Sequence, residues 1–300
     1  MSRPLVHLLM KYSPEWLLEF AKRQKKLLRK KELKAQEQSG GFTKEDLIRD
    51  LQRIGIKEGD SLLVHCSLSK IGFIHGGQET LIQALLETLG KEGTLLMPSF
   101  PASGRNKDYI ETNNVFDVRL TPSAMGKASE TFRLMTGVRR SLHPTDPVCA
   151  YGPLAKFYTE THFGQLTPYN EFSPFRKLAD KHGKILMLGT TLNGAGTSLH
   201  TLEDAVDFPY PVYDKNIYEV TIVDENGNRH QVKTKVHNPA QSAKRNCDAL
   251  KPGFIEAGVL QESSIAQATC MLIDAAGMFQ TMLTNFKERG VTMYTPYGNK

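Results

Sequence analysis

The fold is decided by the stretch Ser61-Leu-Leu-Val-His-Cys-Ser-Leu-Ser-Lys-Ile-Gly-Phe-Ile-His-Gly-Gly77. It predicts a short buried strand over residues 61–65, a loop rich in hydroxyls and glycines, and a helix that begins near Gln78. Unpaired backbone N–H groups and the helix dipole attract anions to such a junction, so this loop is a candidate cradle for a phosphate-bearing ligand. The Gly-Lys-Ser/Thr of a P-loop and the spaced glycines of a dinucleotide fold are both missing. An ordinary strand-to-helix connection is the alternative.

Apolar runs downstream of this stretch predict an α/β fold. Residues 81–89 have the spacing of an amphipathic helix and residues 94–100 form a second apolar strand, which together give a βαβ unit. A further buried strand is expected at residues 184–189. Residues 218–236 alternate on both sides of an Asn-Gly turn and predict an antiparallel ribbon. We therefore expect residues 42–300 to form a layered α/β/α body with a mostly parallel central sheet and this ribbon added to it.

The other stretches of the body predict one loop and several helices. The polar residues 101–123 are expected to be an irregular, functional loop. Helices are expected at residues 124–135, 153–161, 174–182, 239–250 and 271–288.

Composition indicates a soluble globular protein from a reducing compartment. The chain has 300 residues, a hydrophobic fraction of 40% and a mean hydropathy of −0.36. No apolar run reaches the ~18 residues of a membrane span. The four cysteines are scattered without a CxxC pair, which favours free thiols. Because the N-terminus also lacks the features of a signal peptide, we predict a cytoplasmic location.

Residues 1–41 form a separate basic extension and linker. Residues 1–40 hold ten Lys/Arg against four Asp/Glu, so the whole net charge of +6 lies there and the body is neutral. A basic amphipathic helix is expected over residues 14–34, and such a helix can lie on an anionic membrane surface. Docking of this helix on the body, or on a second subunit in a homo-oligomer, is the alternative. The neutral body argues against a nucleic-acid partner.

His200 is the sharpest candidate for chemistry. It lies in the first turn of a predicted helix just beyond a strand end, and Glu203 follows three residues later on the same helix face. A carboxylate neighbour orients an imidazole and makes it a better base. Asp204 and Asp207 add negative charge that suits a cationic amine substrate. A helix-start histidine that is merely satisfied by a local carboxylate is the alternative.

His143, in the loop Ser141-Leu-His-Pro144, is the second candidate, for substrate binding or for a structural hydrogen bond. No metal site is predicted, because no HExxH or paired CxxC occurs and adjacent His65 and Cys66 face opposite ways on a regular strand. A serine hydrolase is disfavoured because no Gly-x-Ser-x-Gly elbow is present.

Six segments in order resemble the aminoglycoside 3-N-acetyltransferase family, and they span roughly residues 42–290. The segments are Val64–Gly72 with Gly76-Gly77, Gly93–Phe100, Phe116–Gly126, Arg140–Pro144 with Ala150–Gly152, Gly183–Gly189, and Thr197-Ser-Leu-His200. The resemblance implies an acetyl-CoA-dependent N-acetyltransferase that needs no metal. It also implies that His200 is the active-site histidine and Glu203 the acid that follows it.

The resemblance further implies that acetyl-CoA binds at the opening loop. The cofactor-binding residues it implies are His65, Ser67, Leu68, Ser69, Gly72, Gly76, Gly77, Ser123 and Met125. In the implied reaction, the His–Glu pair takes a proton from the attacking amine while backbone N–H groups stabilise the oxyanion.

Two features depart from the resistance enzymes of this family, namely the basic extension and the neutral body, since a site for a polycationic aminoglycoside should be acidic. We therefore expect a metabolic relative that acetylates an amino sugar, such as a precursor of a surface polysaccharide. An aminoglycoside acceptor with a role in antibiotic resistance is one alternative. A non-catalytic CoA-binding or membrane-attached interaction protein is the other.

Overall fold

The computed structural model describes residues 20, 23–24, 27–28, 37 and 40–298. The helix predicted for residues 14–34 lies outside the described residues, apart from five isolated positions, and stays a prediction together with its membrane contact. The domain boundary near residue 41 also stays a prediction. In the described part of the chain, no helix has both the length and the apolar character needed to cross a membrane.

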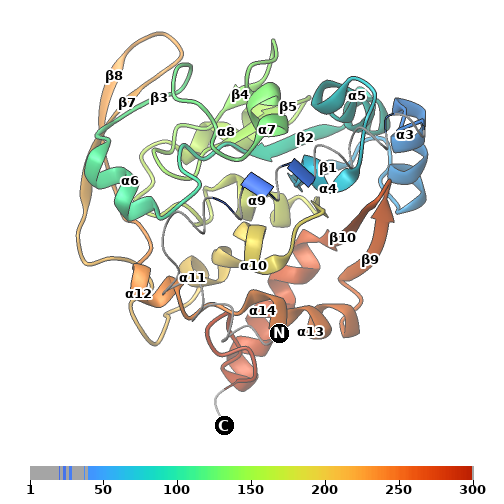
Figure 1. The fold of residues 1–300 in the computed structure, drawn as a ribbon. Coiled ribbons are helices and arrows are strands. Elements are labelled where there is room, and N and C mark those ends of the chain that lie inside the picture. The colour runs from blue at the N-terminus through green and yellow to red at the C-terminus, as the bar shows by residue number, and fades with distance from the viewer. Residues whose placement is uncertain (1–19, 21–22, 25–26, 29–36, 38–39, 299–300) are drawn as a thin grey trace.

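A seven-stranded sheet forms the centre of the molecule (Figure 1). Its order is β4 (Arg139–Arg140), β5 (Val148–Tyr151), β2 (Thr94–Pro98), β1 (Ser61–Cys66), β6 (Lys184–Leu188), β10 (Ala268–Asp274) and β9 (Leu260–Ile265). Strand β1 pairs in parallel with β2 and β6, and the outer pairings are antiparallel. These pairings leave five of the seven strands running in one direction, with β5 and β10 reversed.

Helices cover both faces of this sheet, which confirms the predicted α/β/α layering. One face packs on α3 (Lys44–Arg53), α5 (Gly77–Leu89) and α7 (Lys127–Arg133). The other packs on α8 (Ala155–Thr159), α9 (Pro174–Asp180), α11 (Thr201–Ala205), α13 (Lys251–Glu256) and α14 (Ala275–Arg289). Adjacent residues of β1 divide between the two cores: Leu62 and Val64 face α3 and α5, whereas Leu63 faces the other layer.

The predicted antiparallel ribbon is present as part of a separate small sheet. Strands β7 (Tyr218–Val223) and β8 (Arg229–Thr234) pair around a turn that is fixed by the Asp224 carboxylate, which accepts the backbone N–H groups of Asn226 and Asn228. Strand β3 (Val115–Asp117) joins β7 in parallel and completes the sheet. Its own small core includes Phe116, Ile222 and Val236.

Three of the helix and loop predictions need correction. The helix expected at residues 271–288 begins at Ala275, because residues 268–274 form β10, which pairs with β6 in the core. The helix expected at residues 239–250 is two short turns, α12 (Pro239–Ser242) and η3 (Cys247–Leu250). The loop expected at residues 101–123 contains α6 (Asn106–Thr112) and β3.

The remaining short elements surround the carboxyl ends of the parallel strands. They are α4 (Leu68–Ile71) after β1, α10 (Leu192–Ala195) and η2 (Thr197–His200) after β6, and η1 (Glu160–His162) after α8. In open α/β sheets, ligands bind at this carboxyl edge, and the candidate residues of this chain lie there as well.

Candidate active site

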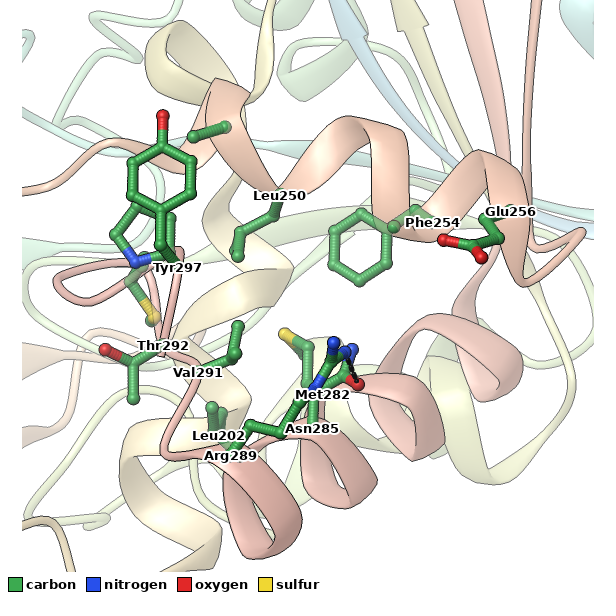
Figure 2. A pocket seen from close by; sticks show the side chains of 14 residues that line it. Leu202, Leu250, Phe254, Glu256, Met282, Asn285, Arg289, Val291, Thr292 and Tyr297 are labelled. Atoms are coloured by element: carbon green, nitrogen blue, oxygen red, sulfur yellow. Dashed lines mark hydrogen bonds between the residues drawn. The ribbon is translucent and has the colours of Figure 1, made fainter. Parts of the chain in front are cut away.

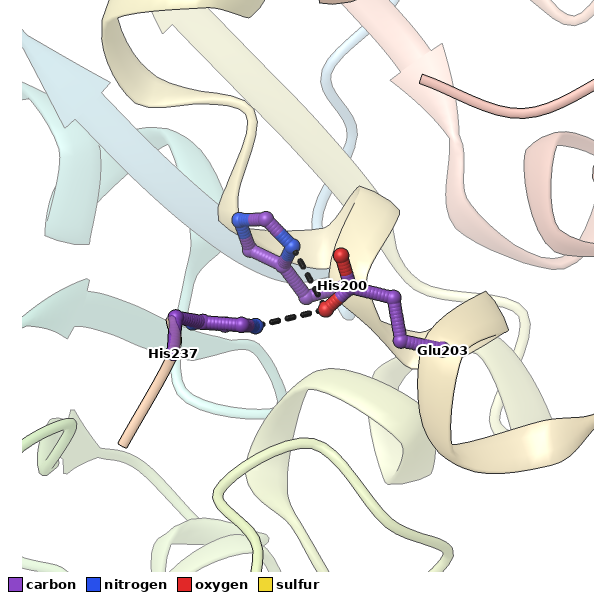
Figure 3. A group of neighbouring side chains, drawn as sticks. All are labelled: His200, Glu203 and His237. Carbon is purple, nitrogen blue, oxygen red and sulfur yellow. Dashed lines mark hydrogen bonds and ion pairs between the residues drawn. The ribbon is translucent and has the colours of Figure 1, made fainter. Parts of the chain in front are cut away.

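His200 is placed by the turns that follow β6. It is the last residue of η2, and the chain continues directly into α11, so that Glu203 lies one turn later on the same face. The Nδ1 atom of His200 lies 3.0 Å from Oε2 of Glu203. Figure 3 shows the other ring nitrogen of His200 pointing away from the carboxylate.

The Glu203 carboxylate is fully buried and surrounded by donors. The Nε2 atom of His237 lies 2.6 Å from the same oxygen Oε2, and the hydroxyl of Tyr294 donates to Oε1 at 2.5 Å. The guanidinium Nη2 of Arg245 lies 3.9 Å from Oε1. Burial alone would raise the pKa of Glu203, but the attraction of His200 and His237 outweighs it and holds the pKa well below its usual range. Glu203 is therefore ionised at neutral pH.

An anionic Glu203 fixes the tautomer of His200. A carboxylate only accepts hydrogen bonds, so Nδ1 of His200 carries the proton and Nε2 keeps its lone pair. Burial lowers the pKa of His200 to about 4, although Glu203 acts in the opposite direction. At neutral pH the imidazole is therefore uncharged, with one nitrogen free to accept a proton.

Tyrosine rings and further carboxylates surround the two histidines. The ring of Tyr169 lies 4.9 Å from that of His200 between centroids, and Tyr213 stacks on His237 at 4.9 Å. Asp204 accepts the Tyr169 backbone N–H and the Tyr213 hydroxyl, so it is held next to the pair rather than free in solvent. Asp207 is exposed.

A cavity of about 720 Å³ opens beside the loop that follows β1. Residues 66–69, 72–74 and 77 of that loop and residues 124–128, which lead into α7, line it, so two segments far apart in sequence form its walls. The predicted cofactor residues Ser67, Leu68, Ser69, Gly72, Gly77 and Met125 are all among its lining residues. Phe73, Ile74 and Lys127 also line it and were not predicted.

Four other predicted residues lie elsewhere. His65 is buried in β1, with its Nε2 atom 3.2 Å from the Thr197 hydroxyl. Gly76 is the N-cap of α5, and the Ser123 hydroxyl bonds that of Ser129. His143 is fully buried and stacked on His162 at 4.6 Å, a position that fits its structural alternative.

His200, Glu203 and His237 together also offer donor atoms of the kind that bind metals. However, both imidazoles approach one carboxylate oxygen at hydrogen-bond distances of 3.0 and 2.6 Å. Metal-bound imidazole would instead direct its nitrogen at an ion about 2.0–2.1 Å away. The arrangement is that of a hydrogen-bonded triad (Figure 3).

A second cavity, of about 290 Å³, lies between α13, α14 and the segment after α14 (Figure 2). Leu250 and Phe254 form one wall, and Met282 and Arg289 form the opposite one. Leu202, the residue before Glu203 in α11, contributes to its lining, so this cavity adjoins the helix that carries Glu203.

Solved structures define the class of protein to which this fold belongs. The aminoglycoside acetyltransferase AAC(3)-Xa superposes with a TM-score of 0.73 at 25% identity, over 88% of this chain and 98% of that one. AAC-IIIb in its binary complex with CoASH gives a TM-score of 0.69 at 26% identity, over 82% and 97% of the two chains. The fold is therefore that of the α/β acetyltransferases to which these two enzymes belong.

Sequence comparison gives the family itself. Residues 63–287 match the aminoglycoside 3-N-acetyltransferase family. An aminoglycoside N(3)-acetyltransferase III of Salmonella is 29% identical over an alignment of 282 positions, which covers 85% of this chain and 95% of the relative. The chain belongs to the aminoglycoside 3-N-acetyltransferase family, as the six segments predicted. It is an N-acetyltransferase whose acetyl donor is acetyl-CoA.

Three residues around Glu203 were not predicted from the sequence: His237, Arg245 and Tyr294. They lie 34, 42 and 91 residues beyond Glu203, and no periodic spacing connects them to it. Only the folded chain shows that all three reach one carboxylate.

Proposed function

We propose that this enzyme acetylates an amino group of an aminoglycoside, with His200 as the general base and Glu203 as the residue that orients it. The observation that carries the proposal is the 3.0 Å bond between His200 Nδ1 and Glu203, which leaves Nε2 free to take a proton. Relatives named as aminoglycoside N(3)-acetyltransferases, and the solved structure of AAC-VIa bound to sisomicin, support this acceptor over the amino-sugar precursor.

The proton balance of the reaction explains why a neutral histidine is needed. The acceptor amine is an ammonium ion at neutral pH, and its nitrogen cannot attack until a proton leaves. His200 Nε2 accepts that proton, the nitrogen forms a bond to the thioester carbon, and the C–S bond breaks. The thiolate takes up a proton to give CoASH, so one proton is released overall. Glu203 stabilises the imidazolium that forms on His200.

We place acetyl-CoA in the cavity lined by residues 66–69, 72–74, 77 and 124–128. The cavity lies at the carboxyl end of β1, next to β6, whose following turns carry His200. Lys127 adds a positive charge on its wall, which suits the phosphates of CoA. Burial raises the pKa of the Cys66 thiol to about 12, so this lining residue stays protonated and direct attack by the amine needs no cysteine nucleophile.

Carboxylates near His200 suit a polycationic acceptor. Glu203 and Asp204 are adjacent in α11, and the buried Asp146 accepts the hydroxyl of Tyr169, whose ring contacts that of His200. Their summed field favours a cationic amine at the base. The guanidinium of Arg245, 3.9 Å from Glu203, offsets one of these three charges.

Steady-state kinetics with purified enzyme test both parts of the proposal. We expect turnover of acetyl-CoA with gentamicin or sisomicin, measured as released thiol, and no turnover with a nucleotide-linked amino sugar. His200→Ala should lower kcat by at least about 100-fold. His230→Ala is the matched control, since His230 bonds Asp224 in the small sheet and should leave kcat unchanged. Turnover of the amino sugar alone would contradict the acceptor, and full activity of His200→Ala would contradict the base.

A further inference from the structure

The two oxygens of Glu203 have different sets of partners. Oε2 receives both histidines, whereas Oε1 receives the hydroxyl of Tyr294 at 2.5 Å. The Nε atom of Arg245 donates to that same hydroxyl at 3.0 Å, so a chain of donors runs from Arg245 through Tyr294 to Glu203. Each hydrogen bond in such a chain polarises and strengthens the next one.

Tyr294 is held in place by a hydrogen-bonded turn. The hydroxyl oxygen of Thr292 accepts the backbone N–H groups of Tyr294 and Thr295, both at 3.0 Å. The backbone N–H of Asn246 donates to the carbonyl of Met293 at 2.8 Å, which ties this segment to the one that carries Arg245. The cavity of Figure 2 lies along the same segment and is lined by Thr292 and Met293. These bonds fix the backbone at Tyr294, while its ring contacts Phe208 and Tyr210.

We propose that Tyr294 is a positioning residue of the transfer reaction: its hydroxyl, oriented by Arg245, holds Oε1 of Glu203 so that Oε2 stays on Nδ1 of His200. The inference rests on the proposed function, because it takes His200 as the base. The match to the family ends at residue 287, so Tyr294 belongs to a segment that lies outside the matched region.

The physical reason is that a carboxylate held at one oxygen only can rotate. Glu203 is fully buried, and without the tyrosine hydroxyl its Oε1 would keep only the guanidinium of Arg245 at 3.9 Å. Rotation toward Arg245 would loosen the bond to Nδ1 of His200 and with it the tautomer that leaves Nε2 free. Orientation of the base would be lost, while the cavity proposed for acetyl-CoA, which Tyr294 does not line, would be unchanged.

Loss of the hydroxyl also changes the basicity of His200 in a defined direction. The groups that face His200 are Glu203 from its own segment, His237, Arg245, and the ring of Tyr169. A carboxylate that rotates away from Nδ1 of His200 stabilises the imidazolium less. The acidic limb of the kcat–pH profile should therefore move to lower pH in the variant.

Tyr294→Phe tests this role, because it removes the hydroxyl and keeps the ring contacts with Phe208 and Tyr210. We expect kcat to fall about tenfold or more, the acidic limb to move to lower pH, and KM for acetyl-CoA to stay within about twofold. Tyr218→Phe is the matched control, because its hydroxyl contacts the Glu111 carboxylate at 3.3 Å instead of Glu203. Its kcat and pH profile should match those of the wild type.

Three outcomes are decisive. Wild-type kcat and pH profile in Tyr294→Phe would overturn the inference, and so would an equal loss in Tyr218→Phe, which would show that the effect is not specific to the bond with Glu203. If His200→Ala keeps full activity, the proposed base is wrong and that result is separate from the role of Tyr294. Melting temperatures of all variants check that each protein is folded.

Discussion

At the residue scale, the chemistry of His200 depends on burial and on one anion. Burial keeps the imidazole neutral, and Glu203 decides which of its nitrogens carries the proton. The sequence could predict this pair because the i, i+3 spacing on a helix is local. It could not predict His237, Arg245 or Tyr294, because their approach to Glu203 depends on how distant segments pack.

Glu203→Gln separates the charge of this residue from its shape. The amide keeps the volume and can still accept a bond from His200, but it cannot stabilise an imidazolium. We expect kcat to fall by about 10²–10⁴-fold with the fold intact. Because Glu203 raises the pKa of His200 against burial, its loss should move the acidic limb of the kcat–pH profile to lower pH than in the wild type.

Glu262→Gln is the control for that experiment, since the Glu262 side chain on β9 forms an exposed ion pair with Lys251 at the start of α13. Its kcat should equal that of the wild type. An acidic limb that moves upward in Glu203→Gln would contradict the charge interaction on which the assignment rests.

At the scale of elements, strands buried on both faces were the easiest to predict. The apolar runs of β1, β2 and β6 gave their positions to within one or two residues, because parallel central strands lack polar alternation. Strand β9 was missed because Gln261, Glu262, Ser263 and Ser264 interrupt its apolar pattern at the sheet edge. For most of β10 the sequence predicts the start of a helix instead of a strand, because a short apolar run fits a strand and a helix equally well.

Residues 66–77 and the start of α7 form one functional unit if acetyl-CoA binds between them. Lys127→Ala should then raise KM for acetyl-CoA by about five- to tenfold and leave kcat and the KM of the aminoglycoside unchanged, because only donor phosphates use this charge. The effect should shrink at high salt, since the contact is exposed. Steady-state kinetics at two ionic strengths measure it.

Lys156→Ala is the matched control, an exposed lysine on α8 that pairs with Glu160 at 3.9 Å. It should leave every kinetic constant unchanged. If Lys127→Ala raised the KM of the aminoglycoside and left the KM of acetyl-CoA unchanged, the cavity beside Lys127 would have to be assigned to the aminoglycoside instead of acetyl-CoA.

At the scale of the whole molecule, several histidines are buried in the folded protein and have little or no access to solvent. Burial lowers the pKa of His65 and of His200 to about 4 and that of His162 to about 3. Burial and the stacked His162 also lower the pKa of His143 well below its usual range. All four stay neutral in the folded protein under conditions in which an unfolded chain would protonate them.

The stability of the protein should therefore fall steeply as the pH drops from 6.5 toward 4. In this window the unfolded state binds up to four more protons than the folded state, and each proton changes the free energy of unfolding by about 1.4 kcal/mol per pH unit. Near pH 5 the slope should reach about 5 kcal/mol per pH unit, with little contribution from carboxyl groups of ordinary pKa. Denaturant unfolding between pH 5.0 and 6.5 measures this slope. His162→Gln should lower this slope by about a quarter, whatever its effect on stability at pH 7. A wild-type slope that corresponds to the uptake of one proton or less would show that the four histidines are not held neutral by the fold.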